Sequence, residues 1–326
     1  MRRLWLLPLA AAALIVVSVL SLAVAALAFG LWRPWLDPFE ALPKPPPAPV
    51  AVMDHGWSAG DRVMRRVMLD AGEAGQAGLT VSLPYPLPER RMPVVVVLGG
   101  LATGEANLRQ IRNPGGNVII GYDWPVSAQL PSGWKAVQTA PELHRRALSA
   151  PGQIAAAIAW ASAQPWADTD RLSLLGFSLG ALAAPAAQRI AQSQDHPVGW
   201  TALAYGGADV GSLLAAHPRL EPKWAGPILA FAADRIFAPI EPAHHLPHLT
   251  GRFLVLGGRG DTMIPADSAR RMRELTPEPK TVVLLEGDHM GVGTDQQALL
   301  DQIVAISRRW LIAQKAVASI PGLDGS

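Results

Sequence analysis

LSLLGFSLG, at residues 172–180, places one serine between two glycines at the end of an apolar run. Its first half has the pattern of a buried strand, and the alanine-rich residues after it are good helix sequence. Ser178 therefore lies on a predicted sharp turn from strand to helix, which lifts its hydroxyl out of the sheet. Gly176 and Gly180 leave room for neighbouring backbone in so tight a turn. A hydroxyl needs a base to become a nucleophile, so this stretch alone is also compatible with an ordinary glycine-rich turn.

Two later apolar runs each end just before a candidate partner for this serine. Asp261 follows the run Phe253–Leu256, and His289 follows the run Val282–Leu285. In an open parallel sheet, ligands bind outside the carboxyl ends of the strands. The order serine, aspartate, histidine along the chain is the order of a nucleophile, its acid and its base on such a sheet. The spacing therefore predicts that Ser178, Asp261 and His289 meet at one edge.

The chain resembles the α/β-hydrolases over most of its length, roughly residues 60–315. The matching motifs are Gly-Phe-Ser-Leu-Gly at 176–180, Gly-Arg-Gly-Asp-Thr-Met-Ile-Pro at 258–265 and Gly-Asp-His-Met-Gly at 287–291. The strand at 94–98 matches the one whose following loop supplies part of the oxyanion hole. There the chain has Gly99-Gly100 where the common pattern is His-Gly. The resemblance implies oxyanion donors at the backbone N–H groups of Leu179 and of Gly100 or Leu101, and it implies no metal or organic cofactor.

Strands alternate with helices along the same region, which is typical of a mostly parallel sheet. We predict an α/β-hydrolase fold: a twisted sheet of about eight strands with helices on both faces, preceded by one transmembrane helix. The strands are expected at 62–71, 78–83, 94–98, 117–122, 172–175 and 200–205, and near Leu254 and Val283. Helices are expected at 152–164, from the serine turn to about 194, and at 296–314.

The first 33 residues have the composition of a membrane anchor. Leu4 to Leu31 contains no charged residue and exceeds the roughly 20 residues that span a bilayer. Arg2 and Arg3 precede it, so the positive-inside rule predicts a single span with the catalytic domain on the extracytoplasmic side. A cleaved signal peptide is the alternative, because Ala23-Val24-Ala25 offers a small-residue cleavage site and would release a secreted protein.

Proline-rich sequence at 34–50 separates this segment from the predicted catalytic domain at 51–326. Such a run favours extended polyproline geometry, so we expect a semi-rigid spacer. A proline-rich ligand for a partner domain is the other interpretation.

Charge and cysteine content exclude several classes of protein. The formal net charge is +2, and three arginines and one aspartate before residue 38 account for it. The rest of the chain is neutral and has no basic patch typical of nucleic-acid binding. The chain contains no cysteine, which excludes disulfides, thiolate metal sites and a cysteine nucleophile.

Other residues compete for the same roles. Asp209 follows the preceding strand, where some members of this superfamily carry the acid. Asp288 adjoins the histidine, but adjacent side chains usually diverge, so a loop-forming role is expected. His244 and His248 have the i, i+4 spacing of a helical metal pair, although Pro242 and Pro247 make a regular helix there doubtful.

These observations predict a membrane-tethered serine hydrolase that cleaves a carboxylic ester through an acyl-enzyme. A peptidase or thioesterase on the same fold is the alternative, as is a non-catalytic binding protein that keeps the fold. The expected partners are a small-molecule or acyl substrate and the membrane, with no nucleic acid.

Overall fold

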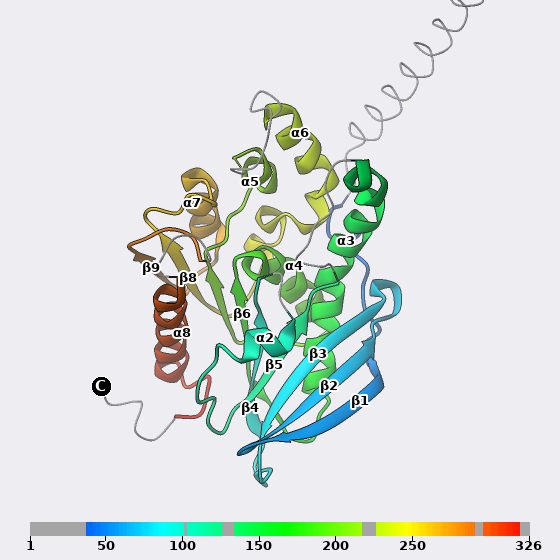
Figure 1. Cartoon of the computed structure of the whole chain (residues 1–326), viewed down its shortest axis with the longest axis vertical. Helices are drawn as coiled ribbons and strands as arrows, with labels where there is room; N and C mark the ends of the chain where they lie inside the picture. The colour runs from blue at the N-terminus through cyan, green and yellow to red at the C-terminus, as the bar shows by residue number, and fades with distance from the viewer. Residues whose placement is uncertain (1–36, 101–102, 126–133, 217–225, 291–295, 320–326) are drawn as a thin grey trace, which may run out of the picture. The chain divides into compact units, whose positions relative to one another are not determined.

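Nine strands form one sheet in the part of the chain that the computed structural model describes, residues 37–319 except 101–102, 126–133, 217–225 and 291–295 (Figure 1). The strands lie in the order β1-β2-β3-β5-β4-β6-β7-β8-β9. The first three pairs in this order are antiparallel, and the other five are parallel. Their bounds are β1 Val50–Ala59, β2 Arg62–Asp70, β3 Gln76–Pro84, β4 Met92–Leu98, β5 Val118–Asp123, β6 Ala167–Phe177, β7 Trp200–Ala204, β8 Arg252–Gly258 and β9 Lys280–Leu285.

Helices cover both faces of the sheet, as predicted. Strand β4 reads MPVVVVL and is buried at every position, as expected of a strand covered on both sides. The helices are α2 Gly104–Leu108, α3 Trp134–Ser162, α4 Leu179–Ser193, α5 Val210–Ala216, α6 Gly226–Ile236, α7 Ala266–Leu275 and α8 Gln296–Ala313. The even-numbered valines of β4 pack in a cluster with α3, α4 and α7, and its odd-numbered valines pack in a second cluster with α2 and α8.

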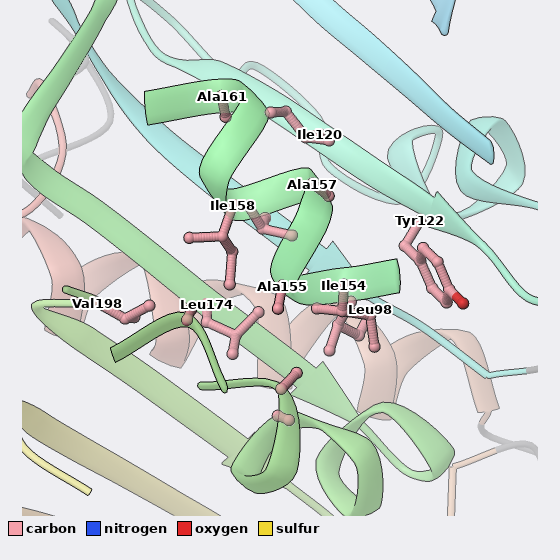
Figure 2. Packing of buried hydrophobic residues seen from close by; sticks show 14 of the residues in the cluster. Leu98, Ile120, Tyr122, Ile154, Ala155, Ala157, Ile158, Ala161, Leu174 and Val198 are labelled. Atoms are coloured by element: carbon pink, nitrogen blue, oxygen red, sulfur yellow. The ribbon is translucent and has the colours of Figure 1, made fainter. Parts of the chain in front are cut away.

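Small side chains let α3 approach the sheet closely (Figure 2). Ile154 and Ile158 are fully buried among alanines of the same helix, and they share a cluster with Leu98, Ile120 and Leu174 of the central strands. Burying one such side chain contributes about 1.5–3 kcal/mol. This packing makes the centre of the sheet a rigid base for the loops at its carboxyl edge.

Several elements differ from the sequence prediction, which did not include helices α2, α5, α6 and α7. Strand β1 and helix α3 also differ. Strand β1, at 50–59, lies at the edge of the sheet, so the sheet has nine strands where about eight were expected. Most of its side chains are exposed, so the strand lacks the alternation of apolar and polar residues that reveals a half-buried strand. Helix α3 begins at Trp134 and contains Pro141 and Pro151, although the prediction placed its start at Gly152. A proline inside a helix removes one hydrogen bond and its ring clashes with the carbonyl four residues earlier, so the sequence favoured a helix that starts after both prolines.

The part of the proline-rich segment that the structure describes, residues 37–49, contacts the domain. Phe39 and Leu42 belong to the buried core, and the guanidinium of Arg189 on α4 lies 4.1 Å from the centre of the Phe39 ring. The amide of Gln194 donates to the carbonyl of Pro45 at 2.8 Å. Residues 37–49 are therefore packed against the domain, and the expectation of a semi-rigid spacer is wrong for them.

The expected membrane-spanning segment, Leu4 to Leu31, lies outside the described residues. Among the residues that are described, none of the helices combines the length and apolar character needed to cross a bilayer.

Candidate active site

Ser178 sits at the junction between β6 and α4, in an unusual backbone conformation with φ +52° and ψ −112°. Such a non-glycine residue at positive φ costs on the order of 1–3 kcal/mol, which the surrounding structure must offset. The Ser178 N–H donates to the carbonyl of Ala204 at 2.9 Å, and its own carbonyl accepts from Ala181 N–H at 2.9 Å. A Cβ on Gly180 would lie 2.0 Å from the Leu98 carbonyl oxygen, so only glycine fits there.

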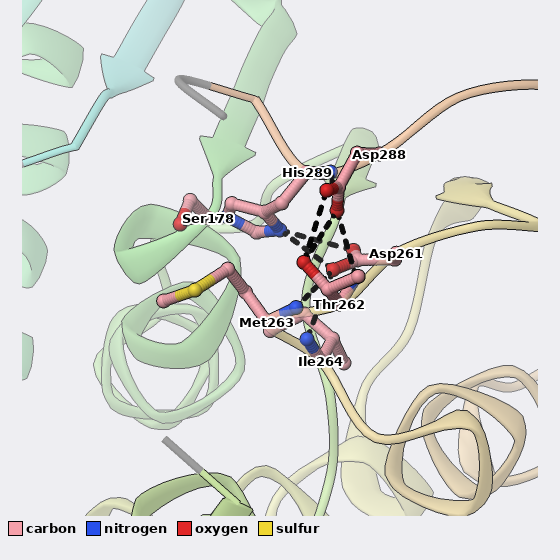
Figure 3. Close-up of polar contacts among 7 residues, drawn as sticks. All are labelled: Ser178, Asp261, Thr262, Met263, Ile264, Asp288 and His289. Carbon is pink, nitrogen blue, oxygen red and sulfur yellow. Dashed lines mark hydrogen bonds and ion pairs between the residues drawn. The ribbon is translucent and has the colours of Figure 1, made fainter. Parts of the chain in front are cut away.

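The structure brings the three predicted side chains together at the carboxyl edge of the sheet (Figure 3). Ser178 Oγ lies 2.8 Å from Nε2 of His289. His289 Nδ1 lies 3.0 Å and 3.2 Å from the two carboxylate oxygens of Asp261. One neutral tautomer satisfies both contacts: Nδ1–H donates to Asp261, and Nε2 accepts from the serine hydroxyl. His289 is 5% exposed, so this chain of hydrogen bonds is shielded from water.

Backbone groups fix the carboxylate of Asp261. Its Oδ1 accepts from the N–H groups of Met263 and Ile264, both at 2.9 Å. These contacts form because the chain turns sharply after β8, within the sequence Asp-Thr-Met-Ile-Pro. A carboxylate that backbone N–H groups fix in this way can orient the imidazole to which it is hydrogen-bonded.

Asp288 does not contact the imidazole ring but joins the two loops that carry the acid and the base. Its carboxylate accepts from the N–H and hydroxyl of Thr262, each at 2.8 Å, and from the His289 N–H at 2.6 Å. These hydrogen bonds hold the pKa of Asp288 below its ordinary value. Asp288 thus lies in the loop-forming position that the sequence indicated.

Asp209 lies at the start of α5 and hydrogen-bonds away from the imidazole. Its carboxylate accepts from the Ser212 N–H at 2.9 Å and from the Ser212 hydroxyl at 2.6 Å. These contacts cap the first turn of the helix.

His244 and His248 lie on short 3₁₀ turns rather than on one regular helix, which the neighbouring prolines explain. Between them, His245 is fully buried and its Nε2 lies 2.8 Å from the Pro239 carbonyl. The described residues contain no group of three or more metal-ligating side chains of the kind that holds an ion.

Tyr205, which sequence analysis did not single out, packs against the candidate base. Its ring is edge-on to the His289 imidazole, with ring centres 5.7 Å apart. Its hydroxyl is buried and finds no hydrogen-bond partner among the described residues. Burial, and then the negative charges of Asp261 and Asp288, raise the pKa of Tyr205 to about 12. The only signal in the sequence is its place directly after an apolar strand.

The predicted oxyanion donors fall partly within the described residues. Leu179 is the first residue of α4, and its N–H donates to no other group in the described part of the chain. Gly100 and Ser178 line the same cavity. The third candidate, Leu101, lies outside the described residues. A helix N-terminus favours negative charge, which suits a developing oxyanion beside Ser178.

A cavity of about 360 Å³ opens beside Ser178, on the face of the sheet that α8 covers. Met290 and Asn107 lie on its lining, and sequence analysis missed both. The Asn107 side chain covers Gly99, where an added Cβ would lie 2.1 Å from Asn107 Oδ1. The Asn107 Nδ2 is buried without a hydrogen-bond partner among the described residues, so this amide is an available donor on the lining of the cavity.

Comparisons with known proteins identify the fold. No protein-family model matches the sequence, and no curated protein matches it either. The structure is similar to acetyl xylan esterase 1 from Thermoanaerobacterium sp. JW/SL YS485, with a TM-score of 0.55 and 12% identity over 82% of this chain and 90% of the esterase.

Two further solved structures are similar. Carboxylesterase Cest-2923 from Lactobacillus plantarum WCFS1 gives a TM-score of 0.56 and 14% identity over 79% of this chain and 99% of that one. A puromycin-hydrolyzing peptidase from Mycobacterium tuberculosis gives 0.57 and 19% over 79% of this chain, but only 41% of the peptidase. At these identities the comparisons establish a shared fold.

Proposed function

Because this chain has the α/β-hydrolase fold, we propose that it is a serine hydrolase that cleaves carboxylic esters. The observation that carries the proposal is the 2.8 Å contact between Ser178 Oγ and His289 Nε2, continued by the 3.0 Å contact between His289 and Asp261. A nucleophile, a base and an orienting acid at these distances are the parts that acyl transfer needs. Esterases among the structurally similar proteins favour an ester over a peptide substrate.

The geometry supports the following first half of the reaction. Ser178 Oγ attacks the ester carbonyl while its proton moves to Nε2 of His289. Asp261 stabilises the imidazolium that results, because its carboxylate already accepts from Nδ1. The Leu179 N–H and a donor near Gly100 stabilise the oxyanion, and one such donor contributes about 2.7–4 kcal/mol in measured cases.

The second half of the reaction returns the enzyme to its starting state. The imidazolium gives its proton to the leaving alcohol, and an acyl-enzyme remains on Ser178 Oγ. Water then enters, loses a proton to His289 and attacks the acyl carbonyl. The carboxylic acid leaves, and the proton returns to the serine.

A fluorophosphonate probe tests this proposal because it reacts with an activated serine. We expect labelling of the folded wild-type protein and none of Ser178→Ala. A substrate panel of short esters, long esters, thioesters and dipeptide amides then ranks the substrate classes. Unlabelled wild-type protein would favour a binding protein that keeps the fold, and faster cleavage of amides or thioesters would favour the alternative chemistries.

We further propose that residues 1–33 anchor the enzyme in a membrane, with residues 51–326 on the extracytoplasmic side. The uncharged run from Leu4 to Leu31 after Arg2 and Arg3 supports this placement.

A further inference from the structure

We infer that the cavity beside Ser178 is an acyl-chain site, so that the substrates are esters of carboxylic acids with a long unbranched apolar chain. This inference rests on the proposed ester hydrolysis. It concerns which half of the ester enters the cavity and how long that half is.

The cavity is lined mainly by aliphatic side chains. Odd-numbered residues of β4 and their neighbours on β5 and β6 form one wall, and residues of α8 form the opposite wall. The first set is Val95, Val97, Ile119 and Leu175, and the second is Leu300, Val304 and Leu311. The cavity exists because α2, the helix between β4 and β5, has only five residues and covers little of this face. An apolar space of about 360 Å³ is within the range of about 300–1,000 Å³ found for ligand pockets.

The cavity is long, and it begins at the reacting atoms. Ser178 and Gly100 lie at the carboxyl edge of the sheet, whereas Asn117 precedes the first residue of β5. Val118 pairs with Val94, so the lining extends about six residue steps along the strands, or roughly 20 Å. A straight alkyl chain fits this shape better than a bulky ring or a sugar does.

Polar contacts at the far end explain why the acyl half, rather than the alcohol half, belongs in the cavity. The Ala318 N–H donates to the Asn117 side chain at 2.8 Å and ties the C-terminal segment across this end. Arg308 on α8 donates to the carbonyl of Arg112 and bridges the side. The alcohol must leave while the acyl group is still attached to Ser178, so the alcohol needs the unobstructed side.

The test compares esters in which one half varies at a time. With the alcohol fixed, kcat/KM should rise about fourfold for each added CH₂ from acetyl towards decanoyl, until the chain fills the cavity. With the acyl group fixed as acetyl, lengthening the alcohol should have a much smaller effect. A steeper dependence on the alcohol than on the acyl chain would overturn the assignment of the two halves.

Two matched variants of the full-length protein locate the effect. Val304→Phe places a ring in the cavity from α8, whereas Ala305→Phe adds the same ring one residue away, at an exposed position outside the lining. We expect Val304→Phe to lower the ratio of decanoyl to acetyl kcat/KM at least tenfold, and Ala305→Phe to leave that ratio unchanged. Equal ratios in both variants would overturn the inference.

Binding separates this inference from the proposed hydrolysis. Decanoate should bind to Ser178→Ala by calorimetry, and Ser178→Ala combined with Val304→Phe should bind it at least tenfold more weakly. If no ester is cleaved but decanoate binds in this manner, the hydrolase proposal fails and the cavity still holds an apolar chain. If Ser178→Ala binds no decanoate, the cavity assignment fails whatever the hydrolysis results are.

Discussion

Three carboxylates are candidates for the acid in the sequence, and the contacts of Asp261, Asp288 and Asp209 predict different roles for them. Ser178→Ala and His289→Ala should each lower kcat by several orders of magnitude, because nucleophile and base act as a unit. Asp261→Asn should cost on the order of 10⁴ in kcat, because an amide favours the wrong imidazole tautomer. Steady-state kinetics on a soluble ester measures all three, with circular dichroism to verify the fold.

Asp209→Asn and Asp288→Asn are the matched controls. Both remove a carboxylate that hydrogen-bonds loop or helix groups rather than the imidazole ring, so each should reduce kcat far less than Asp261→Asn. If Asp209→Asn abolishes turnover and Asp261→Asn keeps it, the acid has been assigned to the wrong strand.

Tyr205 offers a test of how the imidazole is held. Tyr205→Phe removes only a buried hydroxyl without a partner, so kcat and Tm should be unchanged or slightly higher. Tyr205→Leu removes the ring packed on His289, an interaction of about 0.5–1.5 kcal/mol, and should lower kcat three- to tenfold. The pH–rate profile should shift in Tyr205→Leu alone, and an unshifted profile would mean that the ring has only a structural role.

At the scale of the element, the sequence predicted the strands and turns that a local pattern of residues determines. It did not predict the features that depend on contacts between distant parts of the chain. The turn at Ser178 was predictable because an apolar run and two closely packed glycines leave one geometry. The loops of Asp261 and His289 follow the same kind of run. The site residues Tyr205 and Asn107 were not predictable from the sequence. Tyr205 packs on the ring of His289 and Asn107 covers Gly99, and no pattern in the neighbouring sequence indicates either contact. The same holds for β1 and for the packed proline segment.

The packing of the proline-rich segment predicts how far the chain can be truncated from its N-terminus without a loss of stability. A chain that starts at Asp37 should be as stable as the full domain, whereas one that starts at Val50 loses Phe39 and Leu42 from the core. Each lost side chain costs about 1.5–3 kcal/mol, so urea unfolding should distinguish the two truncated chains. Equal midpoints would mean that the segment contributes nothing to the core.

Arg62 joins three elements at the beginning of β2. Its buried guanidinium donates to the Ser82 hydroxyl and to the carbonyls of Ser82, Gly115 and Asn117. Arg62→Lys keeps the charge but leaves buried carbonyls unpaired, and it should lower the free energy of unfolding by about 2–4 kcal/mol. Arg66 lies on the same strand and forms a surface ion pair with Glu105 of α2, so Arg66→Lys should change the free energy of unfolding by less than about 1 kcal/mol.

At the scale of the whole molecule, stability should depend on pH through His245. Burial lowers the pKa of His245 from 6.5 to about 4 in the folded state. Between these values the unfolded chain binds more protons than the folded one, so the stabilisation is present above pH 6.5 and is lost as the pH falls towards 4. From pH 7 to pH 5 this histidine should remove about 2 kcal/mol from the free energy of unfolding.

Urea unfolding of wild type and His245→Gln at both pH values isolates this contribution. The variant should be less stable at pH 7, because the ring packs in the core, but should lose about 2 kcal/mol less on acidification. A pH dependence identical to wild type would assign the acid sensitivity to other groups.

The proposed membrane attachment is also a property of the whole chain. A reporter enzyme fused after Ser326 should behave as exported, and alkaline carbonate should leave the protein in the membrane fraction. A cytoplasmic reporter signal would contradict the proposed orientation, and a mature N-terminus after Ala25 would contradict the anchor.

The packing of residues 37–49 would then limit the length of the connection between the proposed anchor and the domain. The apolar run ends at Leu31 and the core resumes at Phe39, so seven residues separate them. Fully extended, seven residues reach at most about 25 Å, which is shorter than the semi-rigid spacer predicted at residues 34–50. On the proposed anchoring, a hydrolase with so short a connection would sample only a thin layer of solvent against the bilayer. It would meet lipid-soluble esters by lateral diffusion far more often than esters dissolved in the bulk.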